Sequence, residues 1–145
     1  MKRLRTAVIV LSTLVFLAVR AGGAAASDQK LPEGMKKIRC TCYIEHGTTA
    51  TGIKTREGIA AGRSEDLYKV AAIYSIAEDG SIGDFLGYYE FRDTGAGMDS
   101  DGDGIGDTIR TGKSIDVWKP SMDSAKAWVR QYGDYVYIMI IDAEG

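Results

Sequence analysis

The chain has 145 residues, of which 18 are basic and 20 acidic, and its net charge is −2. This length suits a single domain with one modest core. The acidic balance argues against a nucleic-acid partner, because a phosphate backbone attracts proteins with surplus Lys and Arg.

Residues 1–26 are predicted to be a secretory signal peptide. A basic start is followed by an apolar run over 6–19 and by small residues that end at Ala26, which is the three-part layout of such a peptide. An uncleaved membrane anchor is the alternative, although the apolar run is short for a bilayer span. Cleavage leaves 119 residues, with 14 basic and 20 acidic side chains and a net charge of −6. We therefore expect a soluble exported domain with no stable membrane span.

A flexible lead over 27–35 precedes the domain, which we assign to 36–145. The domain opens with alternating apolar and polar residues over 36–44, a pattern typical of a half-buried strand. Cys40 and Cys42 lie two apart in this strand and face the same side, which is poor geometry for a disulfide between them. We interpret them as small residues that face the core.

The next segment, 45–58, is loop-like and rich in Gly and Thr. It holds His46, the one histidine of the chain, which has no catalytic companion at motif spacing and is expected to be exposed. The same segment contains Thr49, Thr51 and Gly52 in a run of small residues. Such a run lets the backbone approach a ligand closely.

Two strand-like segments, 67–76 and 85–91, flank a turn at 79–80 and predict a hairpin. The hairpin runs directly into Asp93, so this residue is expected at a strand end. Side chains in that position emerge from a rigid scaffold.

The C-terminal part is predicted to be a strand, a helix and a strand. Residues 114–118 form the first strand, Ser121 caps the helix and Gly133 ends it, and 134–142 form the last strand. The total of five or six strands and one helix predicts a mainly β fold. A small barrel or sandwich is favoured over a parallel α/β sheet.

Two acidic residues, Asp93 and Asp116, stand beside apolar, strand-like residues. A partly desolvated carboxylate has a raised pKa and can act as a general acid. Two carboxylates that share a cleft separate their affinities for protons, so that one is the acid and one the anion. The alternative is that each Asp only caps a turn.

Between these two residues lies a glycine-spaced acidic run that predicts a calcium loop. Carboxylates stand at relative positions one, three, five and nine, and a Gly stands at six. Arg110 occupies the twelfth position, where such loops carry a bidentate acid, so we expect weak binding. The alternative is a solvated acidic loop. The predicted ligands are the Ile105 carbonyl and the side chains of Asp99, Asp101, Asp103 and Asp107.

Taken in order, the chain contains GTTATG at 47–52, GIAA at 58–61, a hairpin, DTG at 93–95 and IDVW at 115–118. As an ordered set these motifs resemble the three-aspartate (3D) domain family, which is similar to the catalytic domain of membrane-bound lytic transglycosylase A. The resemblance covers most of the chain after residue 38. It implies a small six-stranded double-psi β-barrel with one or two short helices.

The resemblance also implies a reaction and a site. The reaction is non-hydrolytic cleavage of peptidoglycan between N-acetylmuramic acid and N-acetylglucosamine, which leaves a 1,6-anhydro sugar. One carboxyl group suffices if it first gives and then takes a proton, and no cofactor is required. The family pattern makes Asp116 the general acid and Asp93 its helper. The residues expected to line the cleft are Thr49, Thr51, Gly52, Thr94 and Gly95.

The chain departs from the family at two places. Gly62 stands where the family has its first Asp, and the segment between Asp93 and Asp116 is longer by the calcium-like run. The expected function is that of a secreted, monomeric cell-wall enzyme of the lytic transglycosylase type. The alternatives are a non-catalytic barrel that binds cell-wall polysaccharide and a calcium-stabilised exported interaction domain.

Overall fold

The computed structural model describes residues 30–143, so the predicted signal peptide lies outside the described residues. Six strands, one α-helix and one short 3₁₀ helix follow one another along the chain. Their bounds are β1 Met35–Tyr43, β2 Ile59–Gly62, η1 Ser64–Asp66, β3 Val70–Ile76, β4 Ile82–Thr94, β5 Ser114–Trp118, α1 Met122–Tyr132 and β6 Tyr135–Ile141.

The six strands close into a barrel in the order β1-β5-β2-β4-β3-β6, with β6 pairing back to β1. Two pairs, β1 with β5 and β2 with β4, are parallel, and the others are antiparallel. The parallel partners are not consecutive along the chain, and other elements lie between them in sequence. The predicted mainly β fold with six strands is confirmed, and the parallel pairs agree with the expected double-psi arrangement.

Some element bounds differ from the prediction. The strand expected over 67–76 begins only at Val70, because Tyr68 has a positive φ of 71° that interrupts the extended backbone. The strand expected over 85–91 extends from Ile82 to Thr94. The short strand β2 was not assigned from the sequence.

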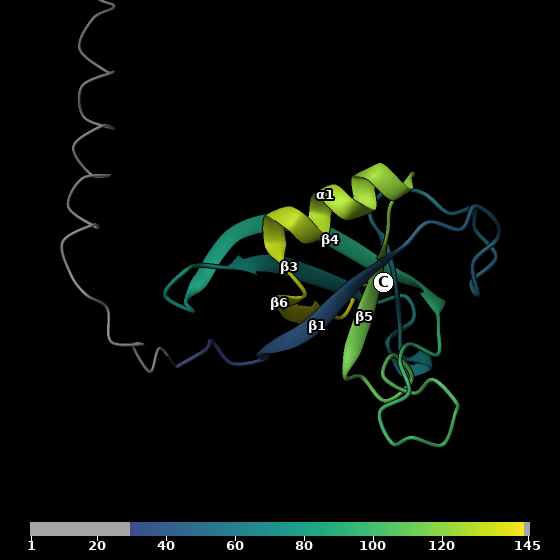
Figure 1. Cartoon of the computed structure of the whole chain (residues 1–145), viewed down its shortest axis with the longest axis horizontal. Helices are drawn as coiled ribbons and strands as arrows, with labels where there is room; N and C mark the ends of the chain where they lie inside the picture. The colour runs from purple at the N-terminus through teal and green to yellow at the C-terminus, as the bar shows by residue number, and fades with distance from the viewer. Residues whose placement is uncertain (1–29, 144–145) are drawn as a thin grey trace, which may run out of the picture.

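The core lies inside the barrel and beneath α1, which covers one side of it (Figure 1). Phe91, Ile73, Val117 and Ile138 are fully buried. Trp128 of α1 is also buried and contacts Tyr89 of β4 edge-on, with ring centroids 5.9 Å apart. The helix therefore completes the core.

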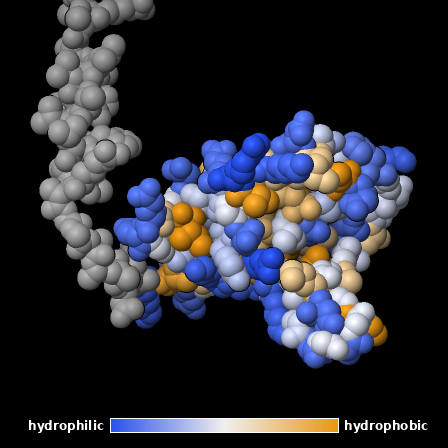
Figure 2. Space-filling model, viewed as in Figure 1, coloured by the Kyte–Doolittle hydropathy of each residue, from blue (hydrophilic) through white to orange (hydrophobic). Residues whose placement is uncertain are grey.

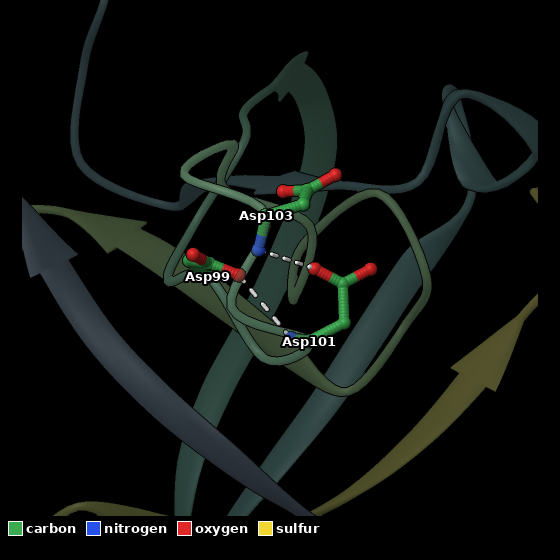
Figure 3. A group of neighbouring side chains, drawn as sticks. All are labelled: Asp99, Asp101 and Asp103. Carbon is green, nitrogen blue, oxygen red and sulfur yellow. Dashed lines mark hydrogen bonds between the residues drawn. The ribbon is translucent and has the colours of Figure 1, made fainter.

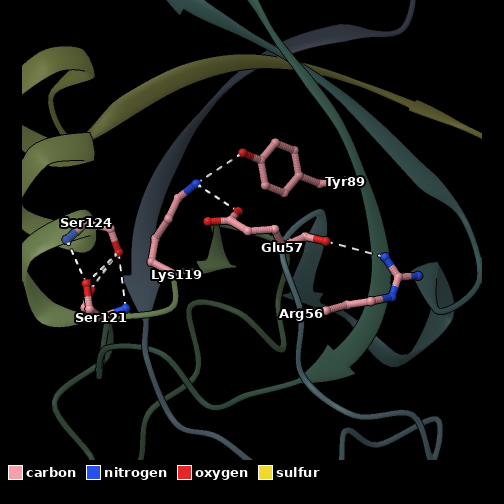
Figure 4. Close-up of polar contacts among 6 residues, drawn as sticks. All are labelled: Arg56, Glu57, Tyr89, Lys119, Ser121 and Ser124. Carbon is pink, nitrogen blue, oxygen red and sulfur yellow. Dashed lines mark hydrogen bonds and ion pairs between the residues drawn. The ribbon is translucent and has the colours of Figure 1, made fainter.

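Two polar arrangements hold α1 in place (Figure 4). The predicted cap is present: Ser121 Oγ accepts from the Ser124 amide, and Ser124 Oγ accepts from the Ser121 amide. Beside the cap, the buried Lys119 donates to Glu57 Oε2 at 3.3 Å and lies 4.3 Å from the ring centroid of Trp128. Because Lys119 contacts both a loop and the helix, it ties α1 to the barrel.

The cysteine prediction is confirmed, since both thiols are free and Cys40 is buried while Cys42 is partly buried. His46 is exposed, as expected, and contacts Trp118 edge-on. Within residues 30–143, no helix has the length and apolar character needed to cross a membrane.

Candidate active site

Four residues from four adjacent strands are paired in one row across the barrel wall. Asp116 of β5 is in register with Thr41 of β1 on one side and with Ala61 of β2 on the other. Ala61 is in register with Asp93 of β4, beside a β-bulge. Residues in register point to the same face of a sheet, so the two predicted acids share a face.

That face is the outside of the barrel. Ile115 and Val117 are buried in the core, so Asp116 between them points outward. One strand separates Asp93 from Asp116, which places their backbones about 10 Å apart. Asp93 lies next to the end of β4, as predicted, and Asp116 lies in the middle of β5, which has the predicted bounds 114–118.

The Asp116 carboxyl is held from one side. Its Oδ1 accepts a hydrogen bond from Thr41 Oγ1 at 2.9 Å, and its Oδ2 has no hydrogen-bond partner among residues 30–143. Burial raises the pKa of Asp116 to about 6, the Thr41 bond opposes this rise, and the charge of Glu45 adds to it. Near pH 6 this group therefore exists in both the acid and the anion forms, which suits proton transfer in both directions.

The Asp93 carboxylate is held by three donors. Its Oδ1 accepts from the backbone amides of Ala50 and Thr94, both at 3.0 Å, and its Oδ2 accepts from Tyr43 Oη at 3.2 Å. These contacts fix its orientation, and they leave it less free than Asp116 to take part in proton transfer. The arrangement suits a group that positions its neighbours.

Tyr43 contacts Asp93 from β1, and the sequence did not assign it a role in the site. Burial raises its pKa, as do the charge of Asp93, the hydrogen bond to Asp93 and the charge of Asp116. Its phenol therefore stays protonated and lies within electrostatic reach of both carboxyls. The alternation in β1 places Tyr43 and Thr41, two residues apart, on the same outer face.

The predicted Thr-Gly loop lies against Asp93. The Thr51 amide donates to the Arg92 carbonyl at 3.1 Å, and the neighbouring Ala50 amide donates to Asp93 itself. A tight turn shapes the loop, since Gly52 has a φ of 87° and donates to the Thr49 carbonyl. Thr49 is buried, and its amide and carbonyl are hydrogen-bonded to Ile53 and Gly52, so it shapes the loop and does not face an open cleft.

Beyond Asp93, a cavity of about 280 Å³ is lined by Thr94 and Gly95 together with Gly62, Ser64 and Arg110. Both predicted cleft residues of the DTG motif therefore border an open space. A Cβ at Gly62 would lie 2.6 Å from Cδ1 of Phe91. The family's first Asp cannot be accommodated at this position unless the buried Phe91 ring moves.

The acidic run forms a loop that projects from the barrel on the side away from α1 (Figure 1). Ligand oxygens of Asp99, Asp101 and Asp103 lie within 4.8 Å of one another (Figure 3). Asp99 Oδ2 accepts from the Gly104 amide at 2.8 Å, and Asp103 Oδ1 accepts from the Ile105 amide at 2.8 Å. Calcium binding stays a prediction for this exposed group.

Asp107 stands apart from the three exposed acids. It is buried, and its carboxylate accepts from the amide and the hydroxyl of Ser100 at 3.1 and 2.9 Å. Among the described residues it does not join the group that could hold an ion. Asp107 therefore closes the base of the loop.

No family model matches the chain, and no curated protein or solved structure matches it. The resemblance to the 3D domain family therefore stays a hypothesis.

Proposed function

We propose that the protein is a secreted cell-wall enzyme of the lytic transglycosylase type, with Asp116 as its general acid and base. The proposal is supported by the raised pKa and the free oxygen of the Asp116 carboxyl. Its pKa is raised to about 6 by burial, and only one of its oxygens is engaged by Thr41. An acid with this pKa is partly protonated near pH 6, where it can both release a proton to a substrate and take one back.

The reaction needs two proton transfers at this one group. Asp116 first gives its proton to the glycosidic oxygen of the leaving N-acetylglucosamine, and the bond from C1 of the muramic acid to that oxygen breaks. The Asp116 carboxylate then takes the proton of the C6 hydroxyl while the C6 oxygen bonds to C1. The product is a 1,6-anhydro sugar, and Asp116 returns to its acid form.

Asp93 and Tyr43 are assigned to positioning. Asp93 is already the acceptor for three donors, and Tyr43 holds it from the side of β1. Because Asp93 is engaged by three donors, Asp116 is the carboxyl of the pair that keeps a free oxygen, which favours the single-acid reaction.

The test is incubation of the purified protein with peptidoglycan, followed by mass analysis of the products. We expect anhydro-muropeptides from the natural protein and a rate at least 100-fold lower from Asp116→Asn, since general acid–base catalysis contributes about 10²–10⁴-fold. Asp84→Asn is the matched control, because Asp84 is an exposed acid near the start of β4. The absence of anhydro products, with Asp116→Asn indistinguishable from the natural protein, would contradict the proposal.

Two further measurements define the reaction. In ¹⁸O-labelled water a hydrolase incorporates the label, whereas an anhydro product formed by the C6 hydroxyl contains none. The initial rate is expected to fall as the pH rises above about 6, because the acid form of Asp116 is lost with its raised pKa. Label in the product would reassign the protein to hydrolysis.

The second candidate is a barrel that binds cell-wall polysaccharide without cutting it. It is favoured by Gly62, which stands at the position of the family's first Asp and packs against Phe91 too closely to admit a side chain. Retention of the protein on insoluble peptidoglycan with no soluble product would select this function. Asp93→Asn would then weaken retention while Asp84→Asn would not.

A further inference from the structure

A groove of about 480 Å³ separates α1 from the adjoining part of β1. One wall is the side of the helix that carries Met122, Lys126, Val129 and Arg130, and the other wall is formed by Thr41 and Cys42. Neither the proposed proton transfers nor the calcium loop uses this space. The residues that line the groove, their charge and the position of the groove beside Asp116 nevertheless favour one kind of ligand.

The helical wall includes large apolar side chains. Met122 and Val129 stand two turns apart on α1 and are 52% and 38% exposed, although both are large hydrophobic residues. Figure 2 shows hydrophobic residues (orange) at the surface next to hydrophilic ones (blue) in the region of α1. A ligand in the groove therefore has an apolar portion.

The same wall carries two cations. Lys126 and Arg130 are four residues apart, so they lie on the same side of the helix, and neither forms an ion pair with a described residue. The one acid that lines the groove is Asp134. Because the chain after residue 26 has a net charge of −6, a groove with surplus positive charge is an exception that favours a ligand with carboxylates.

The opposite wall offers the edge of a strand. β6 pairs with β1 only over Met35–Arg39, and the Cys40 amide then donates to the Asp134 carbonyl at 2.9 Å. Past this point no strand among residues 30–143 continues the sheet on that edge, and Cys42 is one of the residues that line the groove. An extended peptide fits such an edge, because its backbone adds hydrogen bonds to the sheet.

The groove begins beside the candidate acid. Thr41 lines it and also donates its hydroxyl hydrogen to Asp116 at 2.9 Å. A molecule that presents a glycosidic bond to Asp116 therefore has a substituent within reach of the groove. Peptidoglycan carries such a substituent, since short acidic peptides are attached to its muramic acid units.

We propose that the groove between α1 and β1 binds the acidic peptide stem of peptidoglycan. This assignment rests on the proposed function, because it takes peptidoglycan as the substrate. It adds that the protein recognises the peptide part of that substrate. The stem lies extended along the edge of β1 at Cys42, with its apolar groups against Met122 and Val129. Its carboxylates pair with Lys126 and Arg130.

The test compares three soluble probes: N-acetylglucosaminyl-N-acetylmuramyl tetrapeptide, the same disaccharide without the peptide, and the free tetrapeptide. None contains the bond that the proposed reaction cleaves, so affinities are measured without turnover, by NMR titration of the purified protein. We expect the peptide-bearing disaccharide to bind at least 10-fold more tightly than the bare disaccharide. Lys126→Gln and Arg130→Gln are each expected to reduce this preference 3-fold or more.

The matched control is Gln131→Glu, which also changes the net charge by −1 on the exposed surface of α1, outside the groove. It is expected to keep the full preference. Equal affinities for the two disaccharides would overturn the proposal, as would a preference that Lys126→Gln and Arg130→Gln leave unchanged. Self-association that either variant abolishes would assign the groove to a second copy of the chain and would also overturn it.

Failure of this proposal is distinguishable from failure of the proposed function. If the protein produces anhydro sugars from peptide-free glycan strands as fast as from peptide-bearing ones, the enzyme assignment stands and the groove assignment falls. If the protein prefers the peptide-bearing probe but cleaves no peptidoglycan, the groove assignment stands and the enzyme assignment falls. Asp116→Asn is expected to keep the binding preference in either case.

Discussion

Burial of the Asp116 carboxyl links the stability of the fold to pH. Its pKa is raised from 3.8 to about 6, chiefly by desolvation. The folded state therefore holds this proton more tightly than the unfolded state does. The tighter binding of this proton stabilises the folded state fully below about pH 4, and the stabilisation is lost as the pH rises through about 6.

This linkage predicts the effect of Asp116→Asn, which keeps an acceptor for Thr41 and removes the titration. A shift of this size corresponds to roughly 3 kcal/mol at full burial, and partial exposure reduces the expected effect to about 1–2 kcal/mol. The variant should gain this much unfolding free energy relative to the natural protein between pH 4 and pH 8. Urea unfolding at the two pH values measures it, and a difference that does not change with pH would contradict the stated cause.

Tyr68 is the one residue other than Gly with a positive φ, 71°, among residues 30–143. Its ring is 58% exposed and lies 5.1 Å from the guanidinium carbon of Arg92. Left-handed backbone costs a residue with a side chain about 1 kcal/mol, and the contact with Arg92 offsets part of this cost.

Two substitutions at Tyr68 separate the backbone strain from the ring contact. Tyr68→Gly loses the ring but relieves the strain, whereas Tyr68→Ala loses the ring and keeps the strain. We expect the Gly variant to be more stable than the Ala variant by about 1 kcal/mol in urea unfolding, the reverse of the usual order of these residues. An Ala variant at least as stable as the Gly variant would show that the backbone is not strained here.

At the scale of elements, the start of α1 is fixed by the reciprocal bonds between Ser121 and Ser124. Ser121→Ala removes the acceptor for the Ser124 amide and should lower the unfolding free energy by about 1 kcal/mol, because an N-cap substitution of this kind typically has that effect. Ser121→Asp keeps an acceptor and is expected to retain most of the stability. Equal losses in the two variants would indicate that the cap bond contributes nothing to stability. Thermal unfolding followed by circular dichroism measures both.

The sequence predicted best the elements that have local signals, such as a capping residue, a terminal Gly or an apolar run. The helix has a capping residue and a terminal Gly133, and β5 coincides with the predicted 114–118. In contrast, β2 has four residues, all buried, and shows no alternation of apolar and polar side chains. Its pairing with β4 and β5 depends on long-range contacts, which sequence periodicity does not report.

The same distinction applies to the candidate site. Asp116 stands out in the sequence because it interrupts an apolar strand, and Asp93 because it follows a strand-like segment and opens the DTG motif. The structure brings both to one face through Ala61. Thr41 and Tyr43 show only the ordinary alternation of a strand. Their contacts with Asp116 and Asp93 join residues 75 and 50 positions apart, so the closed barrel and not the local sequence places them in the site.

At the scale of the whole molecule, the acidic loop is predicted to couple calcium to global stability. Carboxylate oxygens of Asp99, Asp101 and Asp103 lie within 4.8 Å of one another. An ion bound only by the folded state stabilises it by mass action: with about 2 mM Ca²⁺ and a dissociation constant on the order of 0.5 mM the gain is about 1 kcal/mol. For a domain of this size the melting temperature should rise by about 4 °C. Differential scanning calorimetry with Ca²⁺ and with chelator measures the rise.

Two aspartates of this loop are expected to respond differently to the same substitution. Asp101→Ala removes an exposed ligand, so the melting temperature without calcium should stay nearly unchanged while the calcium-dependent rise is lost. Asp107→Ala removes the buried acceptor for Ser100, so the melting temperature should fall both with and without calcium while the rise persists. If Asp107→Ala abolishes the rise, Asp107 is a ligand after all and the loop closes around the ion. If neither variant changes a calcium-dependent rise, the ion binds elsewhere in the protein.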